Sequence, residues 1–289
     1  MPARRPTNVE VADGATYSFS ELFFSARQLG VQIESTIDAA EGVVGILVAD
    51  GILLIACQLA VLSSAKPAFL LVDPSLPLDR QRYLLEDSNA ILLLRAARFC
   101  ATPAAMSTLD VSMPTLDAGN DTTTSARDLL APSTRLMYIC YTSGSTGRPK
   151  GVSVSCGALA AYADANALMH RVDHRSRVLL TSAVSFDPCI GEAWTALLAD
   201  ATLCLPTRTM VREALGTAVS SARATHVCST PALWATIACA PSSLDSVKCV
   251  ALGGERMSGT LIERWTAPGV HARLCNIYGV TECTVYQAS

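Results

Sequence analysis

Short apolar runs alternate along the chain with longer segments in which apolar residues recur at the spacing of a helix. Most of the short runs lack the apolar–polar alternation of a half-exposed strand, which is typical of strands covered on both faces. This alternation predicts an α/β fold: two subdomains with mostly parallel sheets covered by helices. We expect strands at 43–48, 68–72, 90–94, 136–141, 178–182, 202–205, 226–229, 247–252 and 274–278.

Several helical segments carry start signals as well as periodicity. Segment 21–29 places Leu22, Ala26 and Leu29 on one stripe, and Ser18 three residues before Glu21 forms a capping-box pattern. The most apolar stretch, 51–65, falls short of the roughly 20 residues that a bilayer span needs, so we expect a buried helix and no membrane partner. Further helices are expected at 158–168, 191–198, 212–223, 231–240 and 258–265.

One segment interrupts this pattern near the middle of the chain. Residues 102–134 are rich in Ser, Thr, Asp, Pro and Gly and show no periodicity, which is typical of a connecting region. We therefore expect a first α/β subdomain over 1–115 and a second over 135–289.

Composition narrows the class of protein. Half of the 289 residues are hydrophobic and only 16% are charged, against roughly 25% in an average soluble domain, which excludes intrinsic disorder. The 22 basic and 25 acidic residues give a net charge of −3, so no basic excess favours nucleic acid as a partner. The first residues carry two arginines but no apolar run like that of a secretory signal, so we expect a cytoplasmic protein.

The eleven cysteines form no CxxC pair, so we expect neither a disulfide framework nor a zinc site. Most of them lie in apolar runs, where a reduced cysteine behaves as a small hydrophobic residue. His170 and His174 are four residues apart, a spacing that can hold a metal on one helix face. Without a third ligand, a polar helix end is the preferred interpretation.

The most informative segment is 141–152, which reads Tyr-Thr-Ser-Gly-Ser-Thr-Gly-Arg-Pro-Lys-Gly-Val after an expected strand. Its glycines let backbone amides approach an anion closely, while the hydroxyl groups and Lys150 add donors and a positive charge. We interpret it as a polyphosphate-binding loop rather than a flexible linker. The order Pro149, Lys150, Gly151 excludes a Walker A loop, in which Ser or Thr follows the lysine.

With this loop the chain resembles the adenylate-forming (AMP-binding) superfamily, and within it most closely the amino-acid adenylation domains of nonribosomal peptide synthetases. Val280 stands where that family usually has proline, and Cys156 where histidine is common. The resemblance implies the large N-terminal part of the acyl-adenylate-forming fold. The family continues with a ribose-binding aspartate, a hinge and a small C-terminal domain carrying a catalytic lysine, so we interpret the chain as an incomplete adenylation domain. The further matching motifs, in the family's order, are 15–22, 71–77 with Arg80, 85–88, 185–187, 253–255 and 276–282.

The resemblance implies activation of an amino acid with ATP and Mg²⁺ to aminoacyl-AMP, with release of pyrophosphate and a phosphopantetheine carrier protein as the downstream acceptor. Lys150, Thr281 and Glu282 are the implied catalytic residues, and Glu282 is the implied Mg²⁺ ligand. The implied ATP-binding residues are Thr142, Ser143, Gly144, Ser145, Thr146, Gly147, Lys150, Gly253, Gly254, Glu255, Asn276, Tyr278, Gly279 and Thr281.

For the substrate, the resemblance implies that Asp187 pairs with an α-ammonium group, although this residue could also serve only as a helix N-cap. Gly191 suggests an open side of the pocket, and we expect an apolar or aromatic amino acid. Two alternatives stay open: an acyl- or aryl-CoA synthetase, and a non-catalytic nucleotide-binding remnant that needs a partner or the missing C-terminal domain. The remaining implied pocket residues are Pro188, Cys228, Val250, Leu252, Ile277, Val285 and Tyr286.

Overall fold

The computed structural model describes residues 8–37, 42–49, 51–64, 68–96, 106–112, 125–131, 133–143 and 148–289. Contacts divide the chain into two compact units. Unit 1 comprises Met1–Tyr17, Ala161–Ser182 and Pro188–Ser289, and unit 2 comprises Ser18–Ala160 and Ala183–Asp187. One boundary therefore falls inside helix α4 (Cys156–His170), so residues 135–160 belong with the first half of the chain and not, as we expected, with the second.

Unit 2 is built on a six-stranded sheet that is parallel except for its last pair, β7 and β8. The central strand β3 is buried at every residue, as in a strand covered on both faces. In order, the strands are β6 (Ser107–Val111), β5 (Ala90–Ala96), β3 (Val43–Leu47), β4 (Ala68–Leu71), β7 (Leu136–Thr142) and β8 (Lys150–Ser155).

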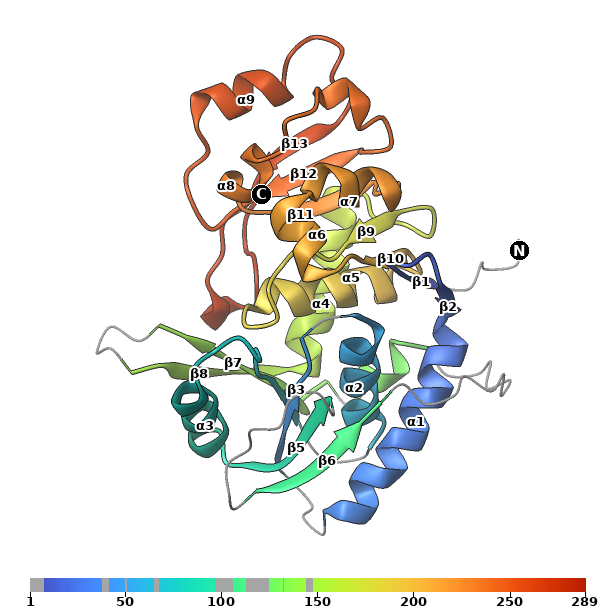
Figure 1. Cartoon of the computed structure of the whole chain (residues 1–289), viewed down its shortest axis with the longest axis vertical. Helices are drawn as coiled ribbons and strands as arrows, with labels where there is room; N and C mark the ends of the chain where they lie inside the picture. Colours follow the sequence, from blue (N-terminus) through green and yellow to red (C-terminus); the bar gives the residue numbers. More distant parts are fainter. Residues whose placement is uncertain are drawn as a thin grey trace. The chain divides into compact units, whose positions relative to one another are not determined.

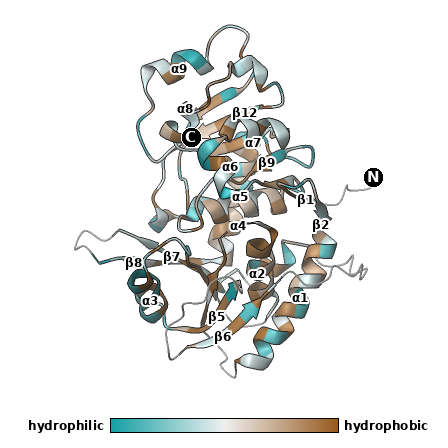
Figure 2. Cartoon of the chain, viewed as in Figure 1, coloured by the Kyte–Doolittle hydropathy of each residue, from teal (hydrophilic) through white to brown (hydrophobic). Residues whose placement is uncertain are grey.

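The helices of unit 2 differ in polarity. Figure 2 shows α2 (Gly51–Ser63) as mostly hydrophobic and α3 (Leu78–Asp87) as largely hydrophilic. Helix α1 (Phe19–Thr36) begins with the predicted capping box, in which the Ser18 hydroxyl accepts from the Glu21 amide and the Glu21 carboxylate accepts from the Ser18 amide. Helices α1 and α2 pack side by side (Figure 1). A 3₁₀ turn, η1 (Asp128–Leu130), completes this unit.

Unit 1 is built on a seven-stranded sheet in which the pairs from β13 to β1 are all parallel. Arg177 in β9 and Glu10 in β1 form an ion pair of 2.6 Å that spans β10 between them. In order, the strands are β13 (Arg273–Asn276), β12 (Cys249–Leu252), β11 (His226–Ser229), β9 (Arg177–Leu179), β10 (Thr202–Leu205), β1 (Asn8–Val11) and β2 (Thr16–Ser18).

Helices cover both faces of the unit 1 sheet. The residues of α4 in this unit and α5 (Asp187–Leu198) lie on one face. The other face carries α6 (Arg208–Glu213), α7 (Leu215–Ser221), α8 (Pro231–Ala235) and α9 (Gly259–Trp265). The 3₁₀ turns η2 (Pro241–Ser243) and η3 (Thr281–Cys283) follow α8 and β13.

Two tryptophans form the centre of the core under α8 and α9. The rings of Trp234 and Trp265 are fully buried with centroids 4.8 Å apart, and they belong to one hydrophobic cluster with Val250 and Leu252 of β12. Within the described residues neither indole N–H has a hydrogen-bond partner. The pair therefore stabilises the fold by packing and by burial of apolar surface. Its two indole N–H groups, buried without hydrogen-bond partners, reduce that stabilisation.

On the opposite face, one buried carboxylate ties α5 to the sheet. Glu192 is 5% exposed, and its carboxylate accepts from the backbone amide of Thr181 at 2.8 Å and from the hydroxyl and amide of Ser182. Burial raises the pKa of Glu192 to about 7, although these donors and the positive charge of Arg208 act in the opposite direction. The helix is thus fixed to the turn that follows β9.

The expected α/β fold is confirmed, with differences that have local causes. The expected helix 212–223 is two helices, because Ala214 leaves the helical region at φ −146° and ψ 44°. The expected helix 231–240 ends at Ala235. Strands β1, β2, β6 and β8 and helix α3 were not predicted. Among the described residues no helix has both the length and the apolarity of a membrane span.

We expect Trp265→Ala to lower the free energy of unfolding by about 3–5 kcal/mol, because it leaves a cavity beside Trp234. Trp265→Phe should cost clearly less, since it keeps an aromatic ring and deletes an unpartnered N–H. Urea unfolding followed by circular dichroism measures both. Equal losses in the two variants would contradict this account of the core.

Glu192 predicts a specific pH dependence of stability. Its pKa in the folded protein, about 7, lies above its usual 4.5, so the folded state holds the proton more tightly and stability falls as pH rises between these values. The loss from this group amounts to about 3 kcal/mol between pH 4 and pH 8. Glu192→Gln keeps one acceptor oxygen for the Thr181 amide and removes the titration. The difference in unfolding free energy between the two proteins should therefore change with pH, and a constant difference would refute this assignment.

Candidate functional site

The predicted phosphate loop connects β7 to β8 in unit 2. Thr142 ends β7, Lys150 begins β8, and the antiparallel register pairs these two residues directly. Ser143 and Lys150 are exposed, so a hydroxyl group and a cation are accessible at the end of this hairpin where the loop connects the two strands. The other implied residues of the loop, Gly144, Ser145, Thr146 and Gly147, lie outside the described residues.

Helix α3 supports the loop end of this hairpin through hydrogen bonds of two tyrosines. The Tyr83 hydroxyl donates to the carbonyl oxygen of Pro149 at 3.1 Å, and the Tyr141 hydroxyl donates to the Asp87 carboxylate at 2.7 Å. The two rings meet edge to face, with centroids 6.4 Å apart. Burial and the neighbouring Asp87 raise the pKa of Tyr141, so it remains a donor. Sequence reasoning missed Tyr83 because it did not predict α3.

Asp187 is the first residue of α5 and belongs to unit 2, where it is 4% exposed. Burial and its negative charge raise the pKa of both Tyr138 and Cys140, the latter to about 12. The carboxyl group is therefore buried beside a phenol and a thiol that stay neutral. Such an environment favours pairing with a positively charged group.

The implied nucleotide-binding residues of unit 1 cluster at the carboxyl ends of two neighbouring parallel strands. Gly253 and Gly254 follow β12, Asn276 ends β13, and Tyr278 comes two residues later with 67% of its surface exposed. The Glu255 carboxylate accepts from the Ala232 amide at 2.6 Å, at the start of α8. In α/β folds this edge of the sheet is where ligands bind.

The remaining motif residues lie after β13 in a segment that folds back on itself. Tyr278 and Ala288 exchange two backbone hydrogen bonds, and Gly279 packs so closely against the backbone of Val285 that a side chain there would collide with it. Thr284 and Val285 have φ of 67° and 63°, a region that β-branched residues rarely adopt. Thr281 is partly buried and Glu282 is exposed, so the carboxylate of Glu282 is accessible to a cation.

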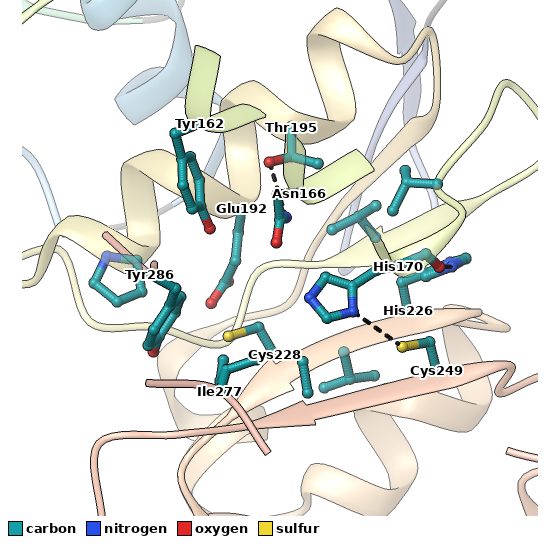
Figure 3. A pocket seen from close by; sticks show the side chains of 15 residues that line it. Tyr162, Asn166, His170, Glu192, Thr195, His226, Cys228, Cys249, Ile277 and Tyr286 are labelled. Carbon is teal, nitrogen blue, oxygen red and sulfur yellow. Dashed lines mark hydrogen bonds between the residues drawn. The ribbon is translucent and has the colours of Figure 1, made fainter. Parts of the chain in front are cut away.

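A pocket lies between the unit 1 sheet and helices α4 and α5 (Figure 3). Its volume is about 40 Å³. Glu192 and Tyr286 point toward one another in this view, and the side-chain amide of Asn166 donates to the Thr195 hydroxyl at 3.1 Å, which links the two helices. The labelled lining residues are Tyr162, Asn166, His170, Glu192, Thr195, His226, Cys228, Cys249, Ile277 and Tyr286.

The charge of this pocket at neutral pH depends chiefly on Glu192. Burial, together with Arg273 and His226, lowers the pKa of His170 to about 4, so this imidazole is neutral. Burial also raises the pKa of Cys228 and of Tyr286, which keeps both in their neutral forms. Glu192 alone among these four groups titrates near neutrality.

The structure brings part of the implied acid pocket together. Pro188, Cys228, Ile277 and Tyr286 line it. Val250 and Leu252 instead belong to the tryptophan cluster on the other face of the sheet. Successive side chains of a strand point to opposite faces, so Cys249 and Ala251 occupy the pocket side of β12. The pocket residues that we expected in β12, Val250 and Leu252, are therefore each one position away from the residues that line the pocket.

Gly191 does not open a side of the pocket, contrary to our expectation. A Cβ atom at this position would lie 2.9 Å from Cε1 of Tyr162 and 3.0 Å from Cγ1 of Val285. Tyr162 from α4 and Val285 from the segment after β13 thus fill the space that a larger residue would occupy. Tyr162 was missed because no motif marks it, and only the packing of α4 on α5 reveals it.

The histidine spacing noted in the sequence does not form a helical pair. Helix α4 ends at His170, and His174 is exposed in the following turn. His170 is instead buried, and its carbonyl oxygen lies 3.0 Å from Nε2 of His226. This contact joins the end of α4 to β11.

Comparison with known proteins assigns the family. The family model described as "AMP-binding enzyme" matches residues 2–288. The chain is 33% identical over 291 residues to Novobiocin biosynthesis protein H of Streptomyces niveus, covering 95% of this chain and 46% of that protein. It is 32% identical over 298 residues to Isonitrile lipopeptide synthase of Streptomyces coeruleorubidus, covering 98% and 20%. The chain thus spans less than half the length of these relatives.

Solved structures agree on the fold. The AMPPNP-bound form of the nonribosomal peptide synthetase FmoA3 superposes with a TM-score of 0.82 at 21% identity, covering 98% of this chain and 31% of that one. Holo-PA1221, a nonribosomal peptide synthetase protein containing adenylation and PCP domains and bound to a vinylsulfonamide inhibitor, gives a TM-score of 0.77 at 21% identity, covering 98% and 48%. With a family match over nearly its whole length, this chain belongs to the AMP-binding enzyme family.

Proposed function

We propose that this chain activates an amino acid with ATP, forming aminoacyl-AMP and pyrophosphate, as part of nonribosomal peptide synthesis. The observation that carries the proposal is the family match over residues 2–288. An amino-acid carboxylate oxygen attacks the α-phosphorus of ATP, and the bond from this phosphorus to the oxygen bridging to the β-phosphate breaks. The phosphopantetheine sulfur of a carrier protein then attacks the aminoacyl carbonyl carbon. The thiol proton is lost, the C–O bond to the phosphate breaks and AMP leaves, which gives the thioester; such a partner is consistent with the adenylation and PCP domains of PA1221.

The main chemical demand of this step is to bring two anions together, so cations and donors must surround the phosphates. The exposed ammonium group of Lys150, beside Thr142 and Ser143, meets this demand in unit 2. In unit 1, Tyr278 offers an exposed ring for adenine, and it follows β13 as Gly253 and Gly254 follow the neighbouring parallel strand β12.

Mg²⁺ fits the donor set, because it binds through few carboxylates together with phosphate oxygens. Glu282, with its exposed carboxylate, is the residue that would hold it, and Thr281 lies beside it for the α-phosphate. Bound Mg²⁺ would neutralise charge on the phosphates.

The proposed substrate is an amino acid rather than a simple carboxylic acid. Asp187 is buried, and its negative charge helps to raise the pKa of Tyr138 and Cys140. We propose that this carboxylate binds the α-ammonium group of the substrate. A pocket of about 40 Å³, narrowed by Tyr162 against Gly191, favours the small end of the apolar range that we expected. An acid without the amine would lack this charge pair with Asp187.

Amino-acid-dependent exchange of labelled pyrophosphate into ATP, measured across the proteinogenic amino acids, tests the reaction. We expect exchange with one small apolar amino acid, lowered about 100-fold or more by Lys150→Met and by Asp187→Asn, because each removes a charge that the reacting groups need. Lys248→Met and Asp245→Asn, which change exposed residues elsewhere in unit 1, are the matched controls and should retain exchange.

Three results would replace this proposal. ATP binding without exchange would favour the non-catalytic remnant. Exchange driven by acids that lack an amine would favour an acyl- or aryl-CoA synthetase. Equal losses in the control variants would show that Lys150 and Asp187 have no special role.

Tyr162→Ala should widen the range of amino acids that support exchange. The substitution empties the space between α4 and Gly191, so we expect the ratio of exchange with phenylalanine to exchange with alanine to rise about tenfold or more. Leu168→Ala, on an exposed position of the same helix, is the control. An unchanged ratio in Tyr162→Ala would exclude this residue as a determinant of side-chain size.

A further inference from the structure

Three side chains with soft or borderline ligand atoms meet at one edge of the unit 1 sheet. They are His170 at the end of α4, Cys249 at the start of β12 and Cys275 in the edge strand β13. Nδ1 of His170 lies 3.6 Å from Sγ of Cys249, which lies 3.9 Å from Sγ of Cys275, and all three atoms lie within 4.8 Å of one another. Figure 3 shows His170 and Cys249 facing each other in the pocket wall.

The two separations that involve Cys249 match those between ligands of one tetrahedral ion. With Zn–S of about 2.3 Å and Zn–N of about 2.0 Å, tetrahedral angles place two sulfur ligands about 3.8 Å apart and a sulfur and a nitrogen about 3.5 Å apart. The two distances in the structure, 3.9 Å and 3.6 Å, agree with these values. Because the third pair, Nδ1 of His170 and Sγ of Cys275, also lies within 4.8 Å, adjustment of these side chains would bring all three atoms onto one ion.

The ligand types select the metal. Two thiolates and an imidazole suit zinc, whereas magnesium and calcium require oxygen ligands. Two thiolates also neutralise the charge of Zn²⁺, so the guanidinium of Arg273, which donates to Cys249 Sγ at 3.8 Å, would face a neutral centre. The same guanidinium is anchored on the Met169 carbonyl oxygen at 2.6 Å and can support the thiolate from outside.

The contacts around the cluster fix the position of His170 and leave the cluster accessible to a metal ion. The carbonyl oxygen of His170 is in contact with His226, so the end of α4 is fixed. His170 and Cys249 are buried, but Cys275 is only partly buried and lies on the edge strand. An ion can therefore reach the cluster from the β13 side.

We propose that His170, Cys249 and Cys275 bind one zinc ion, whose fourth position is taken by a water molecule or a ligand in the adjoining pocket. Binding converts two thiols to thiolates and releases two protons, with no change of oxidation state. The three ligands are residues other than those of the phosphate loop and Glu282, and the zinc proposal does not rest on the proposed adenylation reaction.

The test uses the full chain, reduced and freed of metal. We expect one equivalent of Zn²⁺ to bind in competition with a chromogenic chelator and to raise the melting temperature, with excess Mg²⁺ present throughout. Co²⁺ should give a thiolate charge-transfer band and the intense visible bands of a tetrahedral centre. The spectrum of the unaltered chain requires no substitution, so it remains informative if a variant fails to fold.

Cys249→Ser, Cys275→Ser and His170→Ala should each weaken zinc binding at least about 100-fold, since even outer partners of metal ligands contribute 10- to 100-fold. Cys239→Ser removes an exposed cysteine of the same unit and is the matched control. The proposal is overturned if the folded chain binds no zinc, if the variants bind like the control, or if non-reducing peptide mapping finds Cys249 and Cys275 joined in a disulfide.

Discussion

The pocket in unit 1 depends on one buried carboxylate, that of Glu192. A carboxylate out of water must find donors, and these donors are the amides of Thr181 and Ser182 in the turn after β9. The backbone of the same turn is held from the other side by Arg208, whose guanidinium donates to both carbonyl oxygens. Helix α5 is therefore fixed where β9 ends, and everything that α5 presents to the sheet follows from this attachment.

The second constraint is the alternation of side chains along the parallel strands. Val250 and Leu252 pack on Trp234 and Trp265, and this choice obliges Cys249 and Ala251 to face α4 and α5. The residues that line the pocket are thus determined by the tryptophan cluster on the opposite face. An assignment by motif alignment lacks this information. For β12 it chose Val250 and Leu252, which lie in the core, in place of their neighbours Cys249 and Ala251, which line the pocket.

Much of the architecture could be predicted because its signals are local. The uniformly apolar strand β3 and the capping box at Ser18 and Glu21 are examples, and both are observed as expected. Helix α3 was missed because it is mostly polar, with only three of its residues buried. For the site, the motifs predicted which residues carry chemistry, but Tyr162 could not be found, since its role comes from packing against Gly191 in another helix.

The cluster of His170, Cys249 and Cys275 shows why spacing rules fail for some sites. Zinc motifs are recognised when two ligands share a turn, whereas these ligands come from three elements that meet only because β12 and β13 pair in parallel. The register places Cys275 opposite Ala251, so Cys249 and Cys275 are diagonal neighbours, and α4 delivers His170 above them. A neutral zinc dithiolate there would leave Glu192 as the group that sets the charge of the pocket near pH 7. A cationic ligand in this pocket would then draw the proton from Glu192, because the charge that burial opposes would acquire a partner.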